Sequence, residues 1–160
     1  MSFNHFDEQG RAVMVDVSGK AQTLRIAVAS AKVHMRREIL VDILEGRTAK
    51  GDVFAVARLA GISGAKKTHE LIPLSHPLAI HAVAIDFETD LDSGTIQVKS
   101  TVKAFERTGV EMEAMVAASI TALTIYDMCK GADKGISIGE TVLLYKEGGK
   151  SGIYRREGSL

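Results

Sequence analysis

The segment TGVEMEAMVAASITALTIYDMCK, residues 108–130, predicts one long helix. Thr108 stands three residues before Glu111, which is the spacing of a capping box at a helix N-terminus. After Gly109 the segment contains neither Pro nor Gly, and it is apolar nearly all round. That pattern is typical of a helix buried on more than one side, so we expect the rest of the chain to be arranged around it.

Both ends of this predicted helix carry charge. Glu111 and Glu113 stand at its start, where acids ordinarily complement the helix dipole. Asp127 and Lys130 stand three apart at its end and face each other. They fit an exposed ion pair of small energetic value, or a functional pair whose apolar sequence neighbours shift its proton affinity. Glu113 and Asp127 lie about 21 Å apart along the axis, so they serve one small ligand only if a neighbouring subunit takes part.

Composition indicates one ordinary globular domain over residues 1–160, with residues 1–10 and 153–160 as flexible ends. The chain is 46% hydrophobic and 25% charged, and its 20 basic and 20 acidic residues cancel. This balance argues against a general nucleic-acid or membrane surface. Cys129 has no second cysteine to pair with in a disulfide. With no predicted leader or spanning segment, we expect a cytoplasmic protein.

Apolar periodicity and turn residues predict the other elements. Strands are expected at 12–17, at 23–35 with a bulge near Ala29–Ser30, at 83–88, at 95–107 and at 136–145. Helices are expected at 36–46, from an Asp52 N-cap until Gly61 and Gly64 interrupt it, and at 65–71. Because the strand pairs are hairpins and not alternating βα units, the fold class is α+β. We expect an antiparallel sheet with helices packed on one face.

Several polar groups interrupt the apolar segments and together predict an anion pocket that also contains acids. The segment LIPLSHPL, residues 71–78, holds both prolines of the chain and fixes Ser75 and His76 in an ordered turn. The basic candidates are Lys50, Lys66, Lys67, Lys130, Lys146 and Lys150. Two of these groups also have a plainer interpretation: Lys50 suits a solvated loop, and His76 suits a hydrogen-bonded structural histidine.

Other site classes lack their signatures. KEGGKSG, residues 146–152, has neither the glycine spacing nor the following helix of a P-loop. The five histidines show no zinc spacing, so no metal site is expected. The chain has no GxGxxG motif before a helix, which argues against a dinucleotide enzyme.

Four long blocks of the chain resemble the MoaC family. They are KGDVFAVARLAGI (50–62), LIPLSHPL (71–78), GVEMEAM with AASITALTIYDMCK (within 109–130) and GGKSG (148–152). The resemblance extends from about Val15 to Gly152. It implies a ferredoxin-like fold assembled as a homohexamer, a trimer of dimers, with the site at a subunit interface.

The resemblance also implies an activity. Members of this family are lyases of molybdenum cofactor biosynthesis that make cyclic pyranopterin monophosphate. They convert 3′,8-cyclo-7,8-dihydro-GTP, the product of a radical-SAM GTP cyclase, and release pyrophosphate. No metal or redox cofactor is implied, and the partner is a small molecule, not a nucleic acid or a membrane.

Matched residue by residue, the family's catalytic acid and lysine fall on Asp127 and Lys130, and the lysine of its KGD motif on Lys50. Substrate contacts fall on two groups of residues: Leu74, Ser75 and His76, and Met112 and Glu113. Ser75 stands where the family commonly has Cys, so a thiol role is not carried over, whereas a backbone contact survives the change.

The residues themselves agree with such chemistry. A triphosphate needs several cations, which Lys50, Lys66, His76, Lys130 and Lys146 offer, and ring opening and closure need proton transfer, which Asp127 can supply. Two other classes stay open at this point: a nucleotide-binding regulatory module without turnover, and a structural oligomeric subunit.

Overall fold

The computed structural model describes residues 5–158. Residues 1–4 and 159–160, which belong to the predicted flexible ends, lie outside the described residues. The elements in chain order are β1 (Thr23–His34), α1 (Arg37–Leu44), α2 (Val53–Lys66), α3 (Thr68–Leu71), β2 (Ile80–Asp90), β3 (Thr95–Glu106), α4 (Glu111–Cys129), β4 (Ser137–Glu147) and β5 (Tyr154–Arg155).

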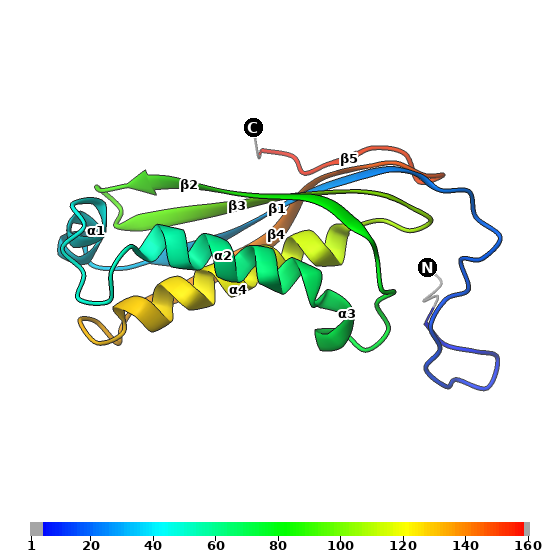
Figure 1. Ribbon diagram of the computed structural model, residues 1–160, viewed down its shortest axis with the longest axis horizontal. Helices are drawn as coiled ribbons and strands as arrows, with labels where there is room; N and C mark the ends of the chain where they lie inside the picture. The colour runs from blue at the N-terminus through cyan, green and yellow to red at the C-terminus, as the bar shows by residue number, and fades with distance from the viewer. Residues whose placement is uncertain (1–4, 159–160) are drawn as a thin grey trace.

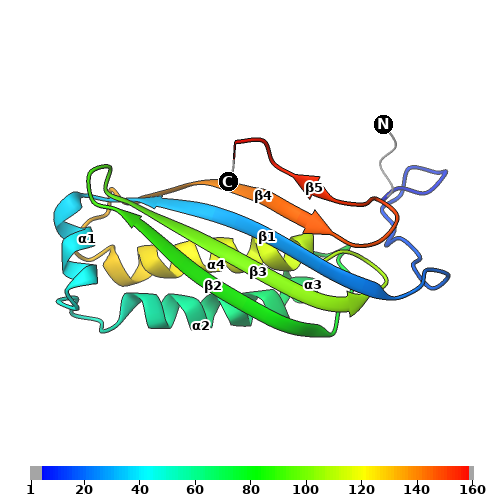
Figure 2. The same cartoon turned by 90° about the horizontal axis from the view of Figure 1, so that it is seen from above.

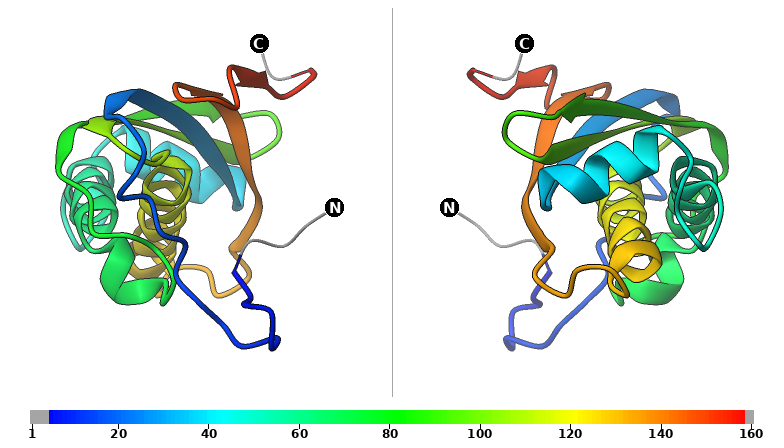
Figure 3. Two further views of the ribbon diagram at one scale, coloured as in Figure 1. Left: turned by 90° about the vertical axis from the view of Figure 1, so that its right-hand side faces the viewer. Right: turned by 90° about the vertical axis from the view of Figure 1, so that its left-hand side faces the viewer.

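The strands form one antiparallel sheet with the order β2-β3-β1-β4-β5. Helices α2 and α4 lie side by side against one face of this sheet (Figures 1 and 2). Figure 3 shows the same two layers end-on. The predicted α+β, ferredoxin-like class with helices on one face is therefore confirmed, as is the hairpin of β2 and β3.

The alternation in β1 differs from the prediction. Alternate residues from Arg25 to Val33 face the helices without interruption, and the β1–β3 register is continuous. A register irregularity is nevertheless present near Ala29–Ser30, as predicted. It is in the β1–β4 pairing, between Val28 and Ala29 and between Ser30 and Lys32, and β4 carries the extra residues. The apolar residues Leu24, Ile26 and Val28 belong to the opposite face of the sheet. Between Arg25 and Val33 the helix-facing side consists of alanines, which allow α4 to approach closely.

The expected capping box at the start of α4 is wrong. The helix begins at Glu111, and Val110 occupies the cap position without a side-chain cap. The Glu111 carboxylate instead contacts the Lys146 ammonium, 2.9 Å away on β4. A charged partner on a neighbouring strand replaces the local backbone bond that the spacing suggested.

Helix α2 is continuous, so the predicted interruption at Gly61 and Gly64 is also wrong. The predicted Asp52 N-cap is confirmed, because the Asp52 side chain accepts a hydrogen bond from the Ala55 main-chain N–H. Both glycines face α4. A Cβ atom on Gly61 would overlap Thr121 Oγ1, and one on Gly64 would lie 2.9 Å from Ile120 Cγ1. These glycines therefore set the closeness of two helices and do not end one.

One further expectation fails near the N-terminus. Residues 12–17 form no strand, since only an isolated bridge joins Phe6 and Ala12. Within the predicted flexible end 153–160, Tyr154 and Arg155 form β5 by pairing with the end of β4.

Helix α4 is the centre of the core. By length and composition alone it could cross a bilayer, which the sequence analysis did not expect of any segment. In the fold, however, many of its apolar residues are buried. Ala114, Ala117, Ala118, Ala122 and Ile125 belong to the core, whereas Met112 and Leu123 are exposed. Burial on two sides therefore explains its composition.

We expect Gly61→Ala to destabilise the protein. In an open helix Ala is preferred over Gly by about 1 kcal/mol, whereas overpacking a tight contact costs about 1–3 kcal/mol. Thermal unfolding should show a Tm several degrees below that of the wild type. Gly19→Ala, whose Cβ would meet no atom within 4 Å, is the matched control. An unchanged or higher Tm for Gly61→Ala would contradict the close-packing account.

Candidate functional site

Three of the candidate residues meet at the C-terminal end of α4. Lys130 Nζ lies 2.6 Å from Asp127 Oδ1. Lys50, in the turn before α2, donates to the Asp127 main-chain carbonyl at 2.8 Å, and its Nζ lies 3.7 Å from Asp127 Oδ2. The two ammonium groups also complement the negative end of the helix dipole. Two lysines and one carboxylate thus form a cluster with a net positive charge.

This cluster is open to solvent, so the expectation of apolar surroundings for Asp127 is wrong in the single chain. The side chain of Asp127 is 60% exposed, and those of Lys50 and Lys130 are each 51% exposed. The Lys130 hydrogen bond and charge, with Lys50 adding to them, lower the pKa of Asp127. The same contact raises the pKa of Lys130. Asp127 is therefore a carboxylate at neutral pH and Lys130 an ammonium.

The other candidates meet at the opposite end of α4. The proline turn and the first turn of α4 enclose a small cavity of about 190 Å³, the proline-turn pocket, which Leu74, Ser75, His76, Met112 and Glu113 help to line. The turn ends at Leu78 and α4 begins at Glu111, so the two are distant in sequence and the fold brings them together.

Glu113 is the unusual group of the proline-turn pocket, because it is only 2% exposed. Burial raises the pKa of Glu113 to about 7, and the neighbouring Glu111 charge adds to the rise against a backbone hydrogen bond that lowers it. Near neutral pH Glu113 therefore exists in both protonation states, which is the condition for a group that accepts and returns a proton.

His76 has the structural partner that the plainer interpretation required. Its Nε2 lies 2.7 Å from the Val15 carbonyl oxygen. Since a carbonyl only accepts, Nε2 carries the proton, and in the neutral ring Nδ1 is left as an acceptor. The contact fixes the ring while leaving one nitrogen able to take part in chemistry.

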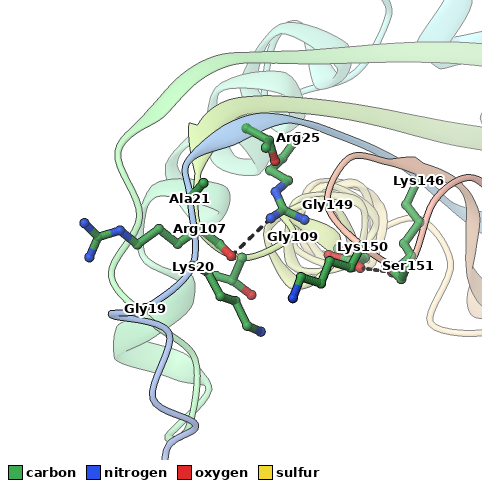
Figure 4. Close-up of a pocket in the computed structure, with 13 residues that line it drawn as sticks. Gly19, Lys20, Ala21, Arg25, Arg107, Gly109, Lys146, Gly149, Lys150 and Ser151 are labelled. Carbon is green, nitrogen blue, oxygen red and sulfur yellow. Dashed lines mark hydrogen bonds and ion pairs between the residues drawn. The ribbon is translucent and has the colours of Figure 1, made fainter.

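A larger cavity of about 620 Å³ adjoins the proline-turn pocket, with which it shares Thr108, Gly109 and Glu111. We call it the cation-lined pocket, because five basic residues line it: Lys20, Arg25, Arg107, Lys146 and Lys150. In Figure 4, Lys20 and Lys150 point into the same space, whereas the Arg107 side chain points away from it. The loop after β4 contributes Gly149 and Ser151.

Arg25 ties the walls of the cation-lined pocket together. It is nearly buried and donates to the carbonyl oxygens of Glu106 and Arg107, each at 3.1 Å. A side chain on Gly149 would overlap its guanidinium, so glycine is required where the loop crosses it. One side chain thereby joins β1, the end of β3 and the loop after β4.

Sequence reasoning selected Lys146 and Lys150 but missed Lys20, Arg25 and Arg107. A signal existed for Arg25, since a charged residue continues the parity of the buried alanines in β1. Nothing local singles out Lys20. Lys66 ends α2 as an exposed residue, and the described residues that line the three cavities at the two ends of α4 do not include it. Within residues 5–158, no three or more His, Cys, Asp or Glu side chains gather as a metal site would require.

The candidate site is therefore in two halves. The cluster of Lys50, Asp127 and Lys130 lies at one end of α4, where Lys50 also lines a cavity of about 400 Å³, and the two joined pockets lie at the other end. At 1.5 Å per residue, Glu113 and Asp127 are about 21 Å apart along the helix. One subunit does not bring the halves together.

Comparison with known proteins gives a consistent result along most of the chain. A relative from Geobacter metallireducens is 72% identical over 157 residues, which is 98% of each chain, and is named cyclic pyranopterin monophosphate synthase. Relatives of the same name from Desulfitobacterium hafniense and Geobacillus kaustophilus are 53% and 52% identical, over 100% and 98% of this chain and 98% of each relative. Residues 14–149 match the model of the MoaC family. The chain thus belongs to the MoaC family.

Proposed function

We propose that this chain is a cyclic pyranopterin monophosphate synthase of molybdenum cofactor biosynthesis, a lyase that acts on 3′,8-cyclo-7,8-dihydro-GTP. One observation carries the proposal: a pocket lined by cations opens beside a pocket that holds a buried acid. A triphosphate ligand with a reactive ring system requires both. The names of the relatives support the same activity, and disfavour a binding module without turnover.

In this proposal the cation-lined pocket binds the triphosphate. Lys20, Arg25, Lys146 and Lys150 offer charge-assisted hydrogen bonds to phosphate oxygens. Charge accumulates on the pyrophosphate as it leaves and the cyclic phosphate forms. Cations fixed at that position stabilise the developing charge, because Arg25 and the glycine loop are already held in place.

The proline-turn pocket then holds the base and sugar. Leu74, Ser75, His76 and Met112 are its binding residues, and Glu113 exchanges protons with the ring system as it opens and closes. A pKa of about 7 suits Glu113 to this task, and the fixed His76 ring offers Nδ1 as an acceptor. Lys66, the last residue of α2, lines neither pocket and is proposed as a further cation for the assembled site.

The complete site is proposed to be shared between subunits of a homohexamer, a trimer of dimers. Asp127, Lys130 and Lys50 of the partner subunit would close the joined pockets, with Asp127 as proton acceptor and the lysines as cations or proton donors. Two observations support association: the open Asp127 cluster, and the exposed apolar residues of the helical layer, Val56, Leu59 and Leu123. Removal of water by a partner would strengthen each charge interaction in the cluster.

The wider setting follows from the proposed chemistry. A radical-SAM GTP cyclase supplies the substrate, the protein works in the cytoplasm, and it needs no metal or redox cofactor of its own.

Turnover of the cyclised substrate tests the proposal, with Asp127→Asn as the decisive variant. We expect the wild type to release pyrophosphate and form the pterin product. Asp127→Asn should lose roughly 10²- to 10⁴-fold in kcat, as removal of a general base does, while the subunit folds normally because the residue is exposed in the single chain. Asp86→Asn on β2 is the matched control. Tight binding of the substrate without pyrophosphate release by the wild type would identify a binding module instead.

Glu113→Gln should change how stability depends on pH. The folded-state pKa of about 7 lies above the ordinary value of 4.5, so the contribution of Glu113 is most favourable below pH 4.5 and is lost as pH rises through 7. The variant should therefore exceed the wild type in Tm at pH 8 by several degrees, and the difference should shrink towards pH 5. A pH-independent difference between the two proteins would argue against a buried titrating carboxyl.

Subunit mixing tests whether the site is shared. Asp127→Asn and Glu113→Gln proteins, each inactive alone, are mixed under conditions that exchange subunits. If the halves come from different subunits, some interfaces in the mixture contain a fully wild-type site, and part of the activity returns. Mixtures that stay inactive despite proven exchange would place both acids in the same subunit's site.

A further inference from the structure

Glu111 is an acid placed inside a pocket built for anions. Glu111 lines both the cation-lined pocket and the proline-turn pocket. The cation-lined pocket is also lined by five basic residues. It folds back over Gly109, and a side chain on that residue would collide with it. The carboxylate reaches the Lys146 ammonium at 2.9 Å, and the two side chains are only 29% and 26% exposed.

The Lys146 ammonium is therefore already paired with the Glu111 carboxylate before a phosphate binds. Besides Glu111, the ammonium contacts Ser151 Oγ at 3.1 Å, a contact drawn in Figure 4. A phosphate oxygen that binds Lys146 must displace the carboxylate or share the ammonium with it. The negative charge of Glu111 also repels the phosphate at close range, where screening is incomplete.

We propose that Glu111 is an internal counter-ion of the cation-lined pocket, which holds Lys146 in place and weakens the binding of short polyphosphates such as pyrophosphate. Its natural ligands are those of the proposed function, on which this part of the inference rests. A triphosphate attached to a ring system is also held by the proline-turn pocket and overcomes the competition. Free pyrophosphate lacks those contacts, so Glu111 promotes its departure. Glu111 is thus a specificity residue that acts through Lys146.

The failed capping box supports this assignment. Glu111 has the spacing to bond the start of its own helix, yet its carboxylate contacts β4 instead. The same charge contributes to the raised pKa of Glu113, so it also couples the two adjoining pockets.

The test measures the affinity of inorganic pyrophosphate by titration calorimetry at low ionic strength, with the assembled protein. Glu111→Gln keeps the shape of the side chain and removes its charge. This variant should bind pyrophosphate roughly fivefold more tightly than the wild type. A roughly fivefold change in affinity corresponds to the free energy of an ion pair near the upper end of the values measured for exposed pairs. Pyrophosphate should also become a stronger product inhibitor. Glu88→Gln, which removes an exposed acid from β2, is the matched control and should leave the affinity unchanged.

A double-mutant cycle with Lys146→Met establishes whether the effect passes through Lys146. In the Lys146→Met background, Glu111→Gln should give a smaller gain, because only the direct repulsion between Glu111 and the phosphate is then removed. Glu111→Asp, which retains the charge but is one methylene shorter, provides a second variant and should fall between the wild type and Glu111→Gln.

Four results would overturn the inference. They are an affinity of Glu111→Gln no higher than that of the wild type, an equal gain without Lys146, an equal gain in Glu88→Gln, and undetectable pyrophosphate binding by Glu111→Gln. The readout is binding of an inorganic ion, so it is separate from the turnover assay. Failure of the counter-ion role is thereby distinguished from failure of the proposed synthase activity.

Discussion

The close contact between α2 and α4 is the constraint on which the rest of the structure depends. Gly61 and Gly64 allow α2 to pack directly against Thr121 and Ile120 of α4. The small alanine side chains of β1 allow α4 to pack close to the sheet. A larger side chain at these positions would separate the layers, because protein interiors have little free space. The contact fixes α4 between two surfaces, and every candidate functional group except Lys66 is positioned relative to one of its ends.

A rigid central helix divides the chemistry in two. Its C-terminal end carries the exposed cluster of Asp127 with two lysines, where the acid stays ionised and the cations stay charged. Its N-terminal end carries the buried Glu113, which titrates near neutrality. Two acids on one helix thus have opposite pKa shifts because one is solvated beside cations and the other is desolvated beside a second acid. This separation is the physical reason for proposing a site that two subunits complete.

In the half of the site at the N-terminal end of α4, several cations are balanced by the carboxylate of Glu111. Cations from β1, β4 and two loops line a common space, and Arg25 bonds β1 to the end of β3 through two main-chain carbonyls. A group of cations without an anion is costly to hold together, and Glu111 relieves that repulsion at Lys146. The pocket is organised before any ligand arrives, and such preorganisation favours stabilisation of charge that develops during a reaction.

The sequence by itself determined the elements whose signals are local. These signals depend only on neighbours along the chain. They include the long apolar helix, the β2–β3 hairpin, the Asp52 cap and the three-residue spacing of Asp127 and Lys130. The helices and the hairpin predicted the fold class. Tertiary structure decided what depends on distant partners. Gly61 and Gly64 read as helix breakers until α4 lay against them, and Glu111 read as a cap until Lys146 stood beside it. Lys20 and Arg25 joined the site only because a loop and a strand far apart in sequence face the same cavity. Periodicity reports which residues are buried, but it does not report which surface buries them or which charges meet there.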